Sequence, residues 1–567
     1  MSSVRIFCKN TGIFKEYPLG TTLAQIAADQ KVALRDDILG ARVNHKLREL
    51  SYEIYKPKNI EFIDIHDTMG YSMYMRSMVF ILFKAVRDLW PETTLKVEHS
   101  LPWGSYCELN GWKGEISLDM VEKIRRQMQE IIDADLPFTR TQMPTQEAIE
   151  IFKKHRLNEK VLLFQTRREL YTSVYTLDNA ANYFYGYLVP STGYIRHFHI
   201  DRYFGNGIIA IRPDLKDTVG ANLQDFLSNL LNEALHGGSK LFKTFQEQKE
   251  WLDIMGVPYV GRLNKVLMEE GPSRLIQVSE ALQEKKIASI ADMVVKRPDC
   301  RIVLISGPSS SGKTTFCKRL SVQLQVLGYQ TAEISLDDYF VDREKTPRDE
   351  NGDYDFEALE AIDRVFFNQQ LQQMLEAKKD TEIKLPTFDF KEGKRKFLGK
   401  KVRITPKTIL IVEGIHGLNP DLTTIDDNYT FKIFVSALTH ISIDAQNPIS
   451  STDNRLIRRL VRDYNFRGSS ALQTLERWPS VKRGANRSIF PYQENANVMF
   501  NSALLFELCV LKKYAEPLLR EIPETSEHYG EALRLLKFLS FFVSIDEKEI
   551  PPTSVLREFL GGSSFVY

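Results

Sequence analysis

The sequence predicts an α/β domain with a mostly parallel sheet in its C-terminal part, preceded by smaller α+β modules. Three observations predict this arrangement. Short, alternating apolar strands occupy residues 1–66. An apolar run at 302–306 ends in a glycine-bounded loop. A second run, at 408–412, is apolar throughout, as is typical of a parallel strand that is buried on both faces.

The glycine-bounded loop has the spacing of a phosphate-binding loop. It consists of Gly307, Pro308, Ser309, Ser310, Ser311, Gly312, Lys313, Thr314 and Thr315. Glycines let the backbone curl so that N–H groups face phosphate oxygens, and the helix that begins near Lys313 adds its positive end. We expect Lys313 to reach the β- and γ-phosphates and Thr314 to offer its hydroxyl to Mg²⁺. The pattern therefore predicts ATP and Mg²⁺ as cofactors.

Composition limits the classes of protein that the chain can belong to. With 567 residues the chain is too long for one hydrophobic core. Its 75 Lys and Arg residues nearly balance 74 Asp and Glu residues, so no global basic field favours nucleic acid or an anionic membrane. The five cysteines are scattered, and no apolar run reaches the ~18 residues of a membrane span. We expect a cytoplasmic protein without a membrane partner.

The N-terminal modules resemble parts of a known family. Residues 1–66 combine short strands with a helix that Thr22 caps, and they resemble a TGS domain, the small ubiquitin-like module at the front of threonyl-tRNA synthetases and some GTPases. Residues 67–213 resemble the next module of those synthetases, the second additional or editing-type domain, through landmarks at 104–106 and 189–193. The resemblance implies a tRNA or RNA contact by residues 1–213.

The editing-type resemblance does not extend to its metal site. Editing enzymes of that family use a His-x-x-x-His pair and a later Cys-x-x-x-His set, and these four places hold Arg76, Phe80, Phe184 and Leu188. Phe and Leu cannot ligate a metal, and a permanent Arg cation repels one. We therefore expect the editing fold without its hydrolytic site. Residues 214–297 then read as a helical linker, with apolar helical spacing at 223–235 and 275–295.

Residues 298–567 carry the signals for catalysis. A short strand at 331–335 is followed by Asp337, which places a carboxylate at the carboxyl end of a strand beside the phosphate-binding loop. The order Ser-x-Asp-x-aromatic-aromatic resembles uridine kinase and its phosphoribulokinase-type relatives. The resemblance implies that Asp337 accepts the proton of the attacking hydroxyl and lies near the metal, with Thr314 and Glu413 as further metal residues. A structural pairing of Glu413 with Lys313 is the alternative.

The substrate residues follow from the same resemblance. Asp355 matches the segment that orients the acceptor sugar, although a helix N-cap role is equally open to it. Tyr339 belongs to the motif around Asp337, and Phe388 and Phe390 match a Pro-x-Tyr-Asp-Phe pattern whose rings stack on a nucleobase. Animal-type uridine-cytidine kinases carry a base-contacting His where this chain has Gly393, which puts pyrimidine specificity in doubt.

A basic segment at 453–468 resembles the Arg-rich lid of uridine kinases. It places Arg458, Arg459 and Arg462 on a predicted helix, followed by Arg467. Arginines spread phosphate charge through paired hydrogen bonds, so we expect the first three to act in catalysis and Arg467 to contact substrate. A solvated basic helix face is the alternative.

Together these resemblances imply an ATP-dependent nucleoside kinase that phosphorylates a 5′-hydroxyl, most directly of uridine or cytidine. Two alternatives stay open. One is a sugar-phosphate kinase of the phosphoribulokinase type, because the basic run at 391–403 suits a phosphorylated acceptor. The other is an RNA-binding regulatory protein with a nucleotide switch. The choice between ATP and GTP as donor, the role of the N-terminal half and the formation of a homo-oligomer also stay open.

Overall fold

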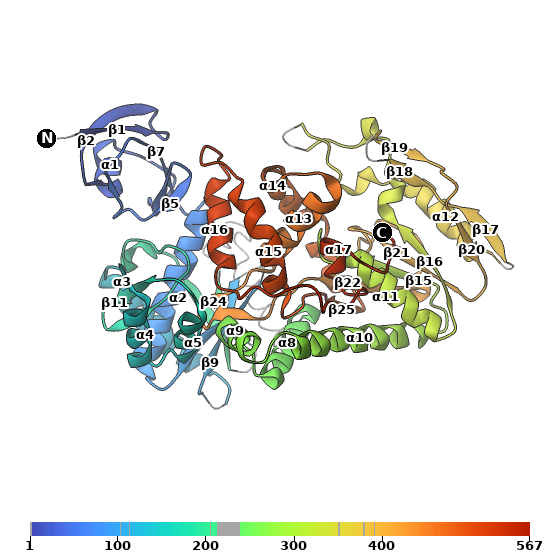
Figure 1. Cartoon of the computed structure of the whole chain (residues 1–567), viewed down its shortest axis with the longest axis horizontal. Helices are drawn as coiled ribbons and strands as arrows, with labels where there is room; N and C mark the ends of the chain where they lie inside the picture. The colour runs from blue at the N-terminus through green and yellow to red at the C-terminus, as the bar shows by residue number, and fades with distance from the viewer. Residues whose placement is uncertain are drawn as a thin grey trace.

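The computed structural model describes residues 3–101, 104–112, 114–203, 206–211, 239–349, 352–377, 380–389 and 392–567. The small N-terminal module lies at one end of the molecule and the parallel sheet lies at the other, with the connecting helices along one side between them (Figure 1). Within the described residues, every helix is too short or too polar to cross a membrane.

The first module is a five-stranded sheet with one helix. The sheet has the order β2-β1-β7-β4-β5, formed by β1 (Ser3–Cys8), β2 (Ile13–Pro18), β4 (Gly40–Val43), β5 (Lys46–Arg48) and β7 (Lys58–Ile63). Two short strands, β3 (Thr21–Thr22) and β6 (Glu53–Ile54), pair beside helix α1 (Leu23–Asp29). The Thr22 hydroxyl accepts a hydrogen bond from the Gln25 N–H at 3.3 Å, which confirms the predicted N-cap.

In the part that the structure describes, the second module combines two sheets with four helices. The helices are α2 (Thr68–Leu89), α3 (Leu118–Asp133), α4 (Thr145–Lys154) and α5 (Asn158–Thr166), with a short 3₁₀ helix η1 (Thr192–Tyr194). One sheet has the order β10-β11-β12, from β10 (Thr139–Pro144), β11 (Tyr171–Leu177) and β12 (Ala180–Asn182). The other has the order β13-β14-β9-β8, from β8 (Thr94–Leu101), β9 (Gly104–Asn110), β13 (His199–Arg202) and β14 (Gly207–Ile211). This α+β architecture confirms the predicted fold class of the N-terminal part.

Within the described residues, three helices connect this module to the C-terminal domain. They are α8 (Lys240–Met255), α9 (Val260–Glu269) and α10 (Ser273–Val295). The last confirms the helix expected at 275–295, whereas the helix expected at 223–235 lies outside the described residues. Helix α9 packs closely on α5, since a Cβ added at Gly261 would lie 2.6 Å from the backbone nitrogen of Leu163.

The C-terminal domain is built on a five-stranded, entirely parallel sheet. Its order is β16-β21-β15-β22-β25, from β15 (Ile302–Ser306), β16 (Gln330–Ser335), β21 (Thr408–Glu413), β22 (Thr430–Ser436) and β25 (Val498–Asn501). The sheet confirms the predicted α/β class. In such a sheet the carboxyl ends of all strands lie at one edge, where ligands bind.

Helices and short hairpins surround this sheet. The helices are α11 (Lys313–Val326), α12 (Arg364–Leu375), α13 (Ser451–Arg467), α14 (Ala471–Ser488), α15 (Glu507–Arg520), α16 (Tyr529–Leu539) and α17 (Arg557–Leu560). The hairpins pair β17 (Thr381–Lys384) with β20 (Lys401–Ile404), β18 (Thr387–Asp389) with β19 (Lys394–Lys396), and β23 (Ser442–Asp444) with β24 (Asn447–Pro448). The 3₁₀ helices are η3 (Leu336–Tyr339), η4 (Arg343–Lys345), η5 (Leu359–Ala361), η6 (Asp427–Tyr429) and η7 (Phe490–Asn495).

The β23–β24 hairpin joins the C-terminal domain to the second module. Its Asp444 carboxylate accepts a hydrogen bond at 2.8 Å from the ammonium group of Lys160, and both side chains are fully buried. Gln446 donates to the Leu95 carbonyl at 2.6 Å and accepts from Lys160 at 2.6 Å. A single hydrophobic cluster extends from α2 to α13, α15 and α16. The two halves of the chain therefore share a core.

Candidate active site

The phosphate-binding loop leads from the end of β15 into α11. Gly312 has a φ of 82° and Ser310 a φ of 60°, so the loop needs left-handed backbone at two positions. A Cβ added at Gly307 would lie 1.9 Å from the Val435 carbonyl oxygen on the neighbouring strand β22. Only glycine fits there, which gives a physical reason for the first glycine of the motif.

Lys313, the first residue of α11, folds back over this loop. Its ammonium donates to the Gly307 carbonyl at 2.8 Å and to the Pro308 carbonyl at 3.3 Å. Burial lowers the pKa of Lys313, and the charges of Glu413 and Asp337 oppose that shift. The ammonium thus contacts the curled loop, and the charges of two carboxylates act on it.

The two carboxylates come from β21, which pairs with β15, and from the turn after β16, which pairs with β21. Asp337 lies on η3, directly after β16, and Glu413 is the last residue of β21. The Ser335 hydroxyl donates to Glu413 at 3.4 Å. Burial raises the pKa of Asp337, and burial raises the pKa of Glu413 to about 7, although Lys313 acts against both shifts. Perturbed acids beside a phosphate-binding loop are typical of a catalytic centre.

The oxygen donors at this place fit a magnesium ion. Mg²⁺ is commonly held by one or two carboxylates together with substrate phosphates and water, so few protein ligands are needed. Thr314 directly follows Lys313 at the start of α11. The charges of Asp337 and Glu413 act on the Lys313 ammonium. Among the described residues, no group of three or more His, Cys, Asp or Glu could hold a metal. Thr314, Asp337 and Glu413 thus suit a metal ion whose remaining ligands are phosphate oxygens and water.

The arginines of α13 have different surroundings. Arg459 donates to the Ser309 hydroxyl at 2.8 Å, so it supports the loop directly. The charges of Arg467 and Arg462 act on Asp337 and oppose the rise of its pKa. Both arginines also contact Asp463, at 3.6 Å and 2.8 Å respectively. The charges of these two arginines thus act on Asp337, and their role at the site stays a prediction.

Arg458 has a different environment from the one predicted for a lid. It is fully buried, and it forms a two-point ion pair with Glu507 of α15 at 2.6 and 3.1 Å. It also donates to the Ser502 carbonyl at 2.9 Å. The geometry favours a structural role behind the loop over the catalytic role that the sequence predicted, because a buried, paired guanidinium cannot close over a substrate.

Two of the predicted substrate residues are buried. Tyr339 is 1 % exposed and donates to Gln370 at 2.8 Å, and Phe388 is 4 % exposed and meets the ring of Phe340 edge-on at 5.6 Å. Burial favours packing roles for both over the predicted contacts with a substrate. Phe390 lies outside the described residues.

Asp355 is held by polar contacts. Its carboxylate accepts a hydrogen bond from Arg487 at 2.6 Å and from the Glu357 N–H at 3.1 Å. The second contact is a local turn of the kind that a helix-capping residue makes. Ribose binding by Asp355 therefore stays a prediction.

Two residues of the site were missed in the sequence. Arg455 donates to the Ser309 carbonyl at 3.0 Å. It precedes Arg459 by four residues and Arg462 by seven, so helical spacing could have found it. Glu558 accepts a hydrogen bond from the Thr315 hydroxyl at 2.7 Å. It lies far away in the sequence, and no motif marks it.

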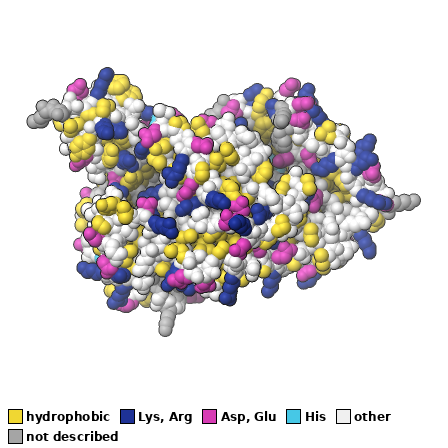
Figure 2. Space-filling model, viewed as in Figure 1, with side chains coloured by type: hydrophobic (Ala, Val, Ile, Leu, Met, Phe, Trp, Pro, Cys, Tyr) yellow, Lys and Arg dark blue, Asp and Glu magenta, His cyan; other side chains and the backbone are white. Residues whose placement is uncertain are grey.

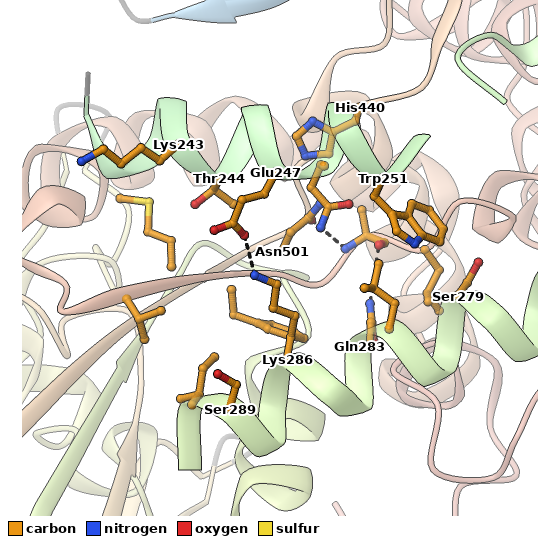
Figure 3. A pocket seen from close by; sticks show the side chains of 18 of the residues that line it. Lys243, Thr244, Glu247, Trp251, Ser279, Gln283, Lys286, Ser289, His440 and Asn501 are labelled. Atoms are coloured by element: carbon orange, nitrogen blue, oxygen red, sulfur yellow. Dashed lines mark hydrogen bonds and ion pairs between the residues drawn. The ribbon is translucent and has the colours of Figure 1, made fainter. Parts of the chain in front are cut away.

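A separate cavity of about 230 Å³ lies between α8, α10 and β25 (Figure 3). Trp251, His440 and an ion pair between Lys286 and Glu247 at 2.5 Å contribute to its lining. Gln283 reaches from this cavity to the Ser502 carbonyl at 3.0 Å. The cavity thus borders the segment behind the phosphate-binding loop, but Lys313 and its carboxylates are not part of its lining.

The positions that match the editing metal site lie in packed surroundings. Phe80 and Phe184 are buried with their ring centroids 5.3 Å apart, and Leu188 is buried as well. Arg76 donates to the Tyr187 carbonyl at 3.2 Å. A Cβ added at Gly186 would lie 2.2 Å from the Arg76 guanidinium carbon. The guanidinium therefore occupies space that the glycine leaves open.

Comparison with protein families identifies the C-terminal domain. Residues 302–505 match the model of the Phosphoribulokinase / Uridine kinase family. That range runs from the first residue of β15 to beyond β25, so it contains the whole parallel sheet and the arginine helix. The resemblance to this family is therefore confirmed over residues 302–505.

The N-terminal part is similar to threonine–tRNA ligases. That of Desulforamulus reducens is 28% identical over 186 residues, which are 33% of this chain and 29% of the ligase. That of Syntrophomonas wolfei is 27% identical over 197 residues, 35% of this chain and 30% of the ligase. The chain thus spans about 30% of the length of these relatives.

Two kinases are among the solved structures that match this chain at low similarity. The "Possible Uridine Kinase" of Bacillus stearothermophilus is 19% identical, with a TM-score of 0.24, and the match covers 38% of this chain and 98% of that one. D-glycerate 3-kinase of Cryptococcus neoformans is 15% identical, with a TM-score of 0.21 and coverage of 47% and 89%.

Proposed function

We propose that this protein is an ATP-dependent kinase that phosphorylates the 5′-hydroxyl of a nucleoside. The main support is the convergence of Lys313, Asp337 and Glu413 beside the carboxyl ends of three adjacent strands, β15, β16 and β21. A cation, a base and a metal-binding carboxylate are the groups that phosphoryl transfer requires of a protein.

Each residue then has a defined part in the reaction. MgATP, when bound, supplies the γ-phosphoryl group, and Thr314, Glu413 and Asp337 supply oxygen ligands for its metal. Asp337 accepts the proton of the attacking hydroxyl. Lys313 stabilises the negative charge of the phosphates, and Arg462 and Arg467 stabilise the charge that gathers on the transferred group.

The contacts of the basic hairpin strands favour a neutral acceptor over a sugar phosphate. Lys396 pairs with Asp389 at 3.0 Å, and Lys400 pairs with Asp338 at 2.8 Å. Arg403 forms an ion pair with Asp380. Cations that already have carboxylate partners attract a phosphorylated sugar only weakly, and an uncharged nucleoside does not need them. A nucleoside is therefore the class of acceptor that we expect, and the resemblance to uridine kinases puts uridine and cytidine first.

A second function has one observation in its favour. The similarity of the N-terminal part to threonine–tRNA ligases supports an RNA-binding regulatory protein in which the phosphate-binding loop is a switch. On the face drawn in Figure 2, basic and acidic side chains are interspersed. Such a surface gives less general attraction to RNA than a continuous basic one.

The test is the release of ADP from MgATP in the presence of single acceptors. The acceptors are uridine, cytidine, adenosine, guanosine, inosine and ribulose 5-phosphate, and a parallel series uses MgGTP. Stimulation by a nucleoside that is lost in Lys313→Ala supports the kinase. The regulatory function is favoured if ATP binds but no acceptor stimulates the release of ADP, and if the protein binds tRNA in a gel-shift assay.

A further inference from the structure

The last residues of the chain lie on the phosphate-binding loop. We call residues 551–567, which include α17, the C-terminal strap. The Glu558 carboxylate accepts hydrogen bonds from the Thr315 hydroxyl at 2.7 Å and from the Thr315 backbone N–H at 3.3 Å. The hydroxyl of Tyr567 lies 2.9 Å from the same Thr315 hydroxyl. The strap and the C-terminus thus meet the start of α11 (Figure 1).

The N–H of Thr315 belongs to the phosphate cradle of this motif. Backbone N–H groups of the loop and of the first turn of the following helix hold the α- and β-phosphates of a bound nucleotide. Thr315 is the third residue of α11, and it is buried, whereas Lys313 and Thr314 are only half-buried. The strap therefore covers one end of the cradle and leaves the lysine end more accessible.

Packing holds the strap in this position. Leu556 and Phe559 are fully buried, and the Phe559 ring lies 5.1 Å from the guanidinium of the buried Arg458. Asn465 of α13 donates to the Phe559 carbonyl at 3.0 Å. A Cβ added at Gly312 would lie 2.4 Å from a methyl group of Val555. The strap is thus a fitted element of the domain and touches both the loop and the arginine helix.

The negative charge of Glu558 reaches the rest of the site. It is one of the charges that raise the pKa of Glu413 and that oppose the lowering of the Lys313 pKa. A carboxylate that binds a helix N-terminus through two donors occupies the place of a phosphate oxygen in both shape and charge. Two anions cannot share the Thr315 N–H, because the second would lose its hydrogen bond and meet a like charge.

We propose that the C-terminal strap is an autoinhibitory segment whose Glu558 carboxylate occupies the α-phosphate position of the phosphate-binding loop. Nucleotide binding then requires the strap to leave Thr315. The strap's role rests on the proposed function, since a nucleotide has to be the ligand that it excludes. Pyrophosphate can occupy the Lys313 end of the cradle alone, so it competes less with Glu558.

Calorimetric titration of the full-length chain tests this competition. MgATP and magnesium pyrophosphate are each titrated into wild type, Glu558→Gln and Glu558→Ala. Glu549→Gln is the matched control, because it removes the same charge from an exposed residue of the nearby chain. We expect the Glu558 variants to bind ATP about tenfold more tightly, which corresponds to about 1.4 kcal/mol. We expect pyrophosphate affinity to change less than twofold, and Glu549→Gln to behave as wild type.

Three outcomes would contradict the autoinhibitory role of the strap. Equal ATP affinity in wild type and Glu558→Ala would show that Glu558 does not inhibit ATP binding. The proposed kinase function would be unaffected. An equal gain for pyrophosphate and ATP indicates a general charge effect instead of a blocked α-phosphate position. Binding of pyrophosphate without ATP in every variant removes the proposed function, and the strap's role falls with it.

A measurement on the wild type avoids any effect of substitution on folding. Hydrogen exchange of the peptides that cover residues 551–567 is followed with and without saturating MgATP. Displacement of the strap predicts faster exchange in these peptides when ATP is bound. Slower exchange would mean that the strap closes over the nucleotide, which is the opposite of autoinhibition.

Discussion

At the scale of single residues, Glu413 is a carboxyl group of the candidate active site whose charge changes near neutral pH. Burial raises its pKa from 4.5 to about 7. The folded protein therefore holds a proton on this carboxyl between these two values, and the unfolded chain does not. The stabilisation that this proton gives is present at low pH and is lost as the pH rises from about 4.5 to about 7.

The same titration predicts how magnesium binding depends on pH. Mg²⁺ binds the carboxylate and not the carboxylic acid, so binding releases a proton below pH 7. We expect Mg²⁺ affinity, measured calorimetrically with ADP present, to rise between pH 6 and pH 8 and then level off. Glu413→Gln should bind more weakly and lose this dependence. A wild-type affinity that is flat over this range would show that Glu413 is not a metal residue.

Residue spacing predicted some parts of the site and not others. The positions of Gly307, Lys313 and Asp337 follow from a local motif, because the chemistry of the loop dictates them. The burial of Phe388 could not be predicted, since an aromatic side chain packs in a hydrophobic core as readily as it stacks on a ligand. Glu558 could not be predicted either, because it reaches Thr315 only through the tertiary fold.

At the scale of elements, α13 is the helix that organises the site. The arginine spacing in the sequence showed a helix with a cationic surface, but it did not show which arginines face the core. The structure places Arg459 against the loop and Arg458 against α15. Neighbouring positions on one helix thus have different functions because they point in different directions.

The buried pair between Arg458 and Glu507 leads to a prediction about stability. Arg458→Met leaves the Glu507 carboxylate buried without a charge partner, so we expect a loss of about 3–5 kcal/mol in the free energy of unfolding. The double variant Arg458→Met, Glu507→Leu should regain part of this loss, because it removes both charges. Urea unfolding measures the difference. A single variant as stable as wild type would indicate that Arg458 is not a structural residue.

At the scale of the whole molecule, the two halves of the chain are more closely joined than separate modules on a linker would be. The sequence predicted the order of the modules, which composition and motifs define locally. It did not predict that the β23–β24 hairpin reaches the second module, because this contact depends on Lys160 and Asp444, which are far apart in the chain. A shared core of this kind favours cooperative unfolding.

Removal of the buried Lys160 charge tests this coupling. Lys160→Met leaves Asp444 fully buried without its cation, so we expect a loss of about 3–5 kcal/mol and a single thermal transition at a lower midpoint. Lys153→Met, on the exposed surface of α4, is the control and should change the midpoint little. Two resolved transitions in the wild type would instead indicate that the halves unfold independently.

The transfer of labelled phosphate tests the central claim most directly. The full-length protein is incubated with γ-labelled ATP, Mg²⁺ and uridine or cytidine, and the label in the nucleoside product is counted for wild type and Asp337→Asn. We predict label in the nucleoside 5′-monophosphate, with a rate that falls about 10²- to 10⁴-fold in the variant because the general base is lost. ATP hydrolysis without label in any nucleoside, or equal rates for both proteins, would contradict it.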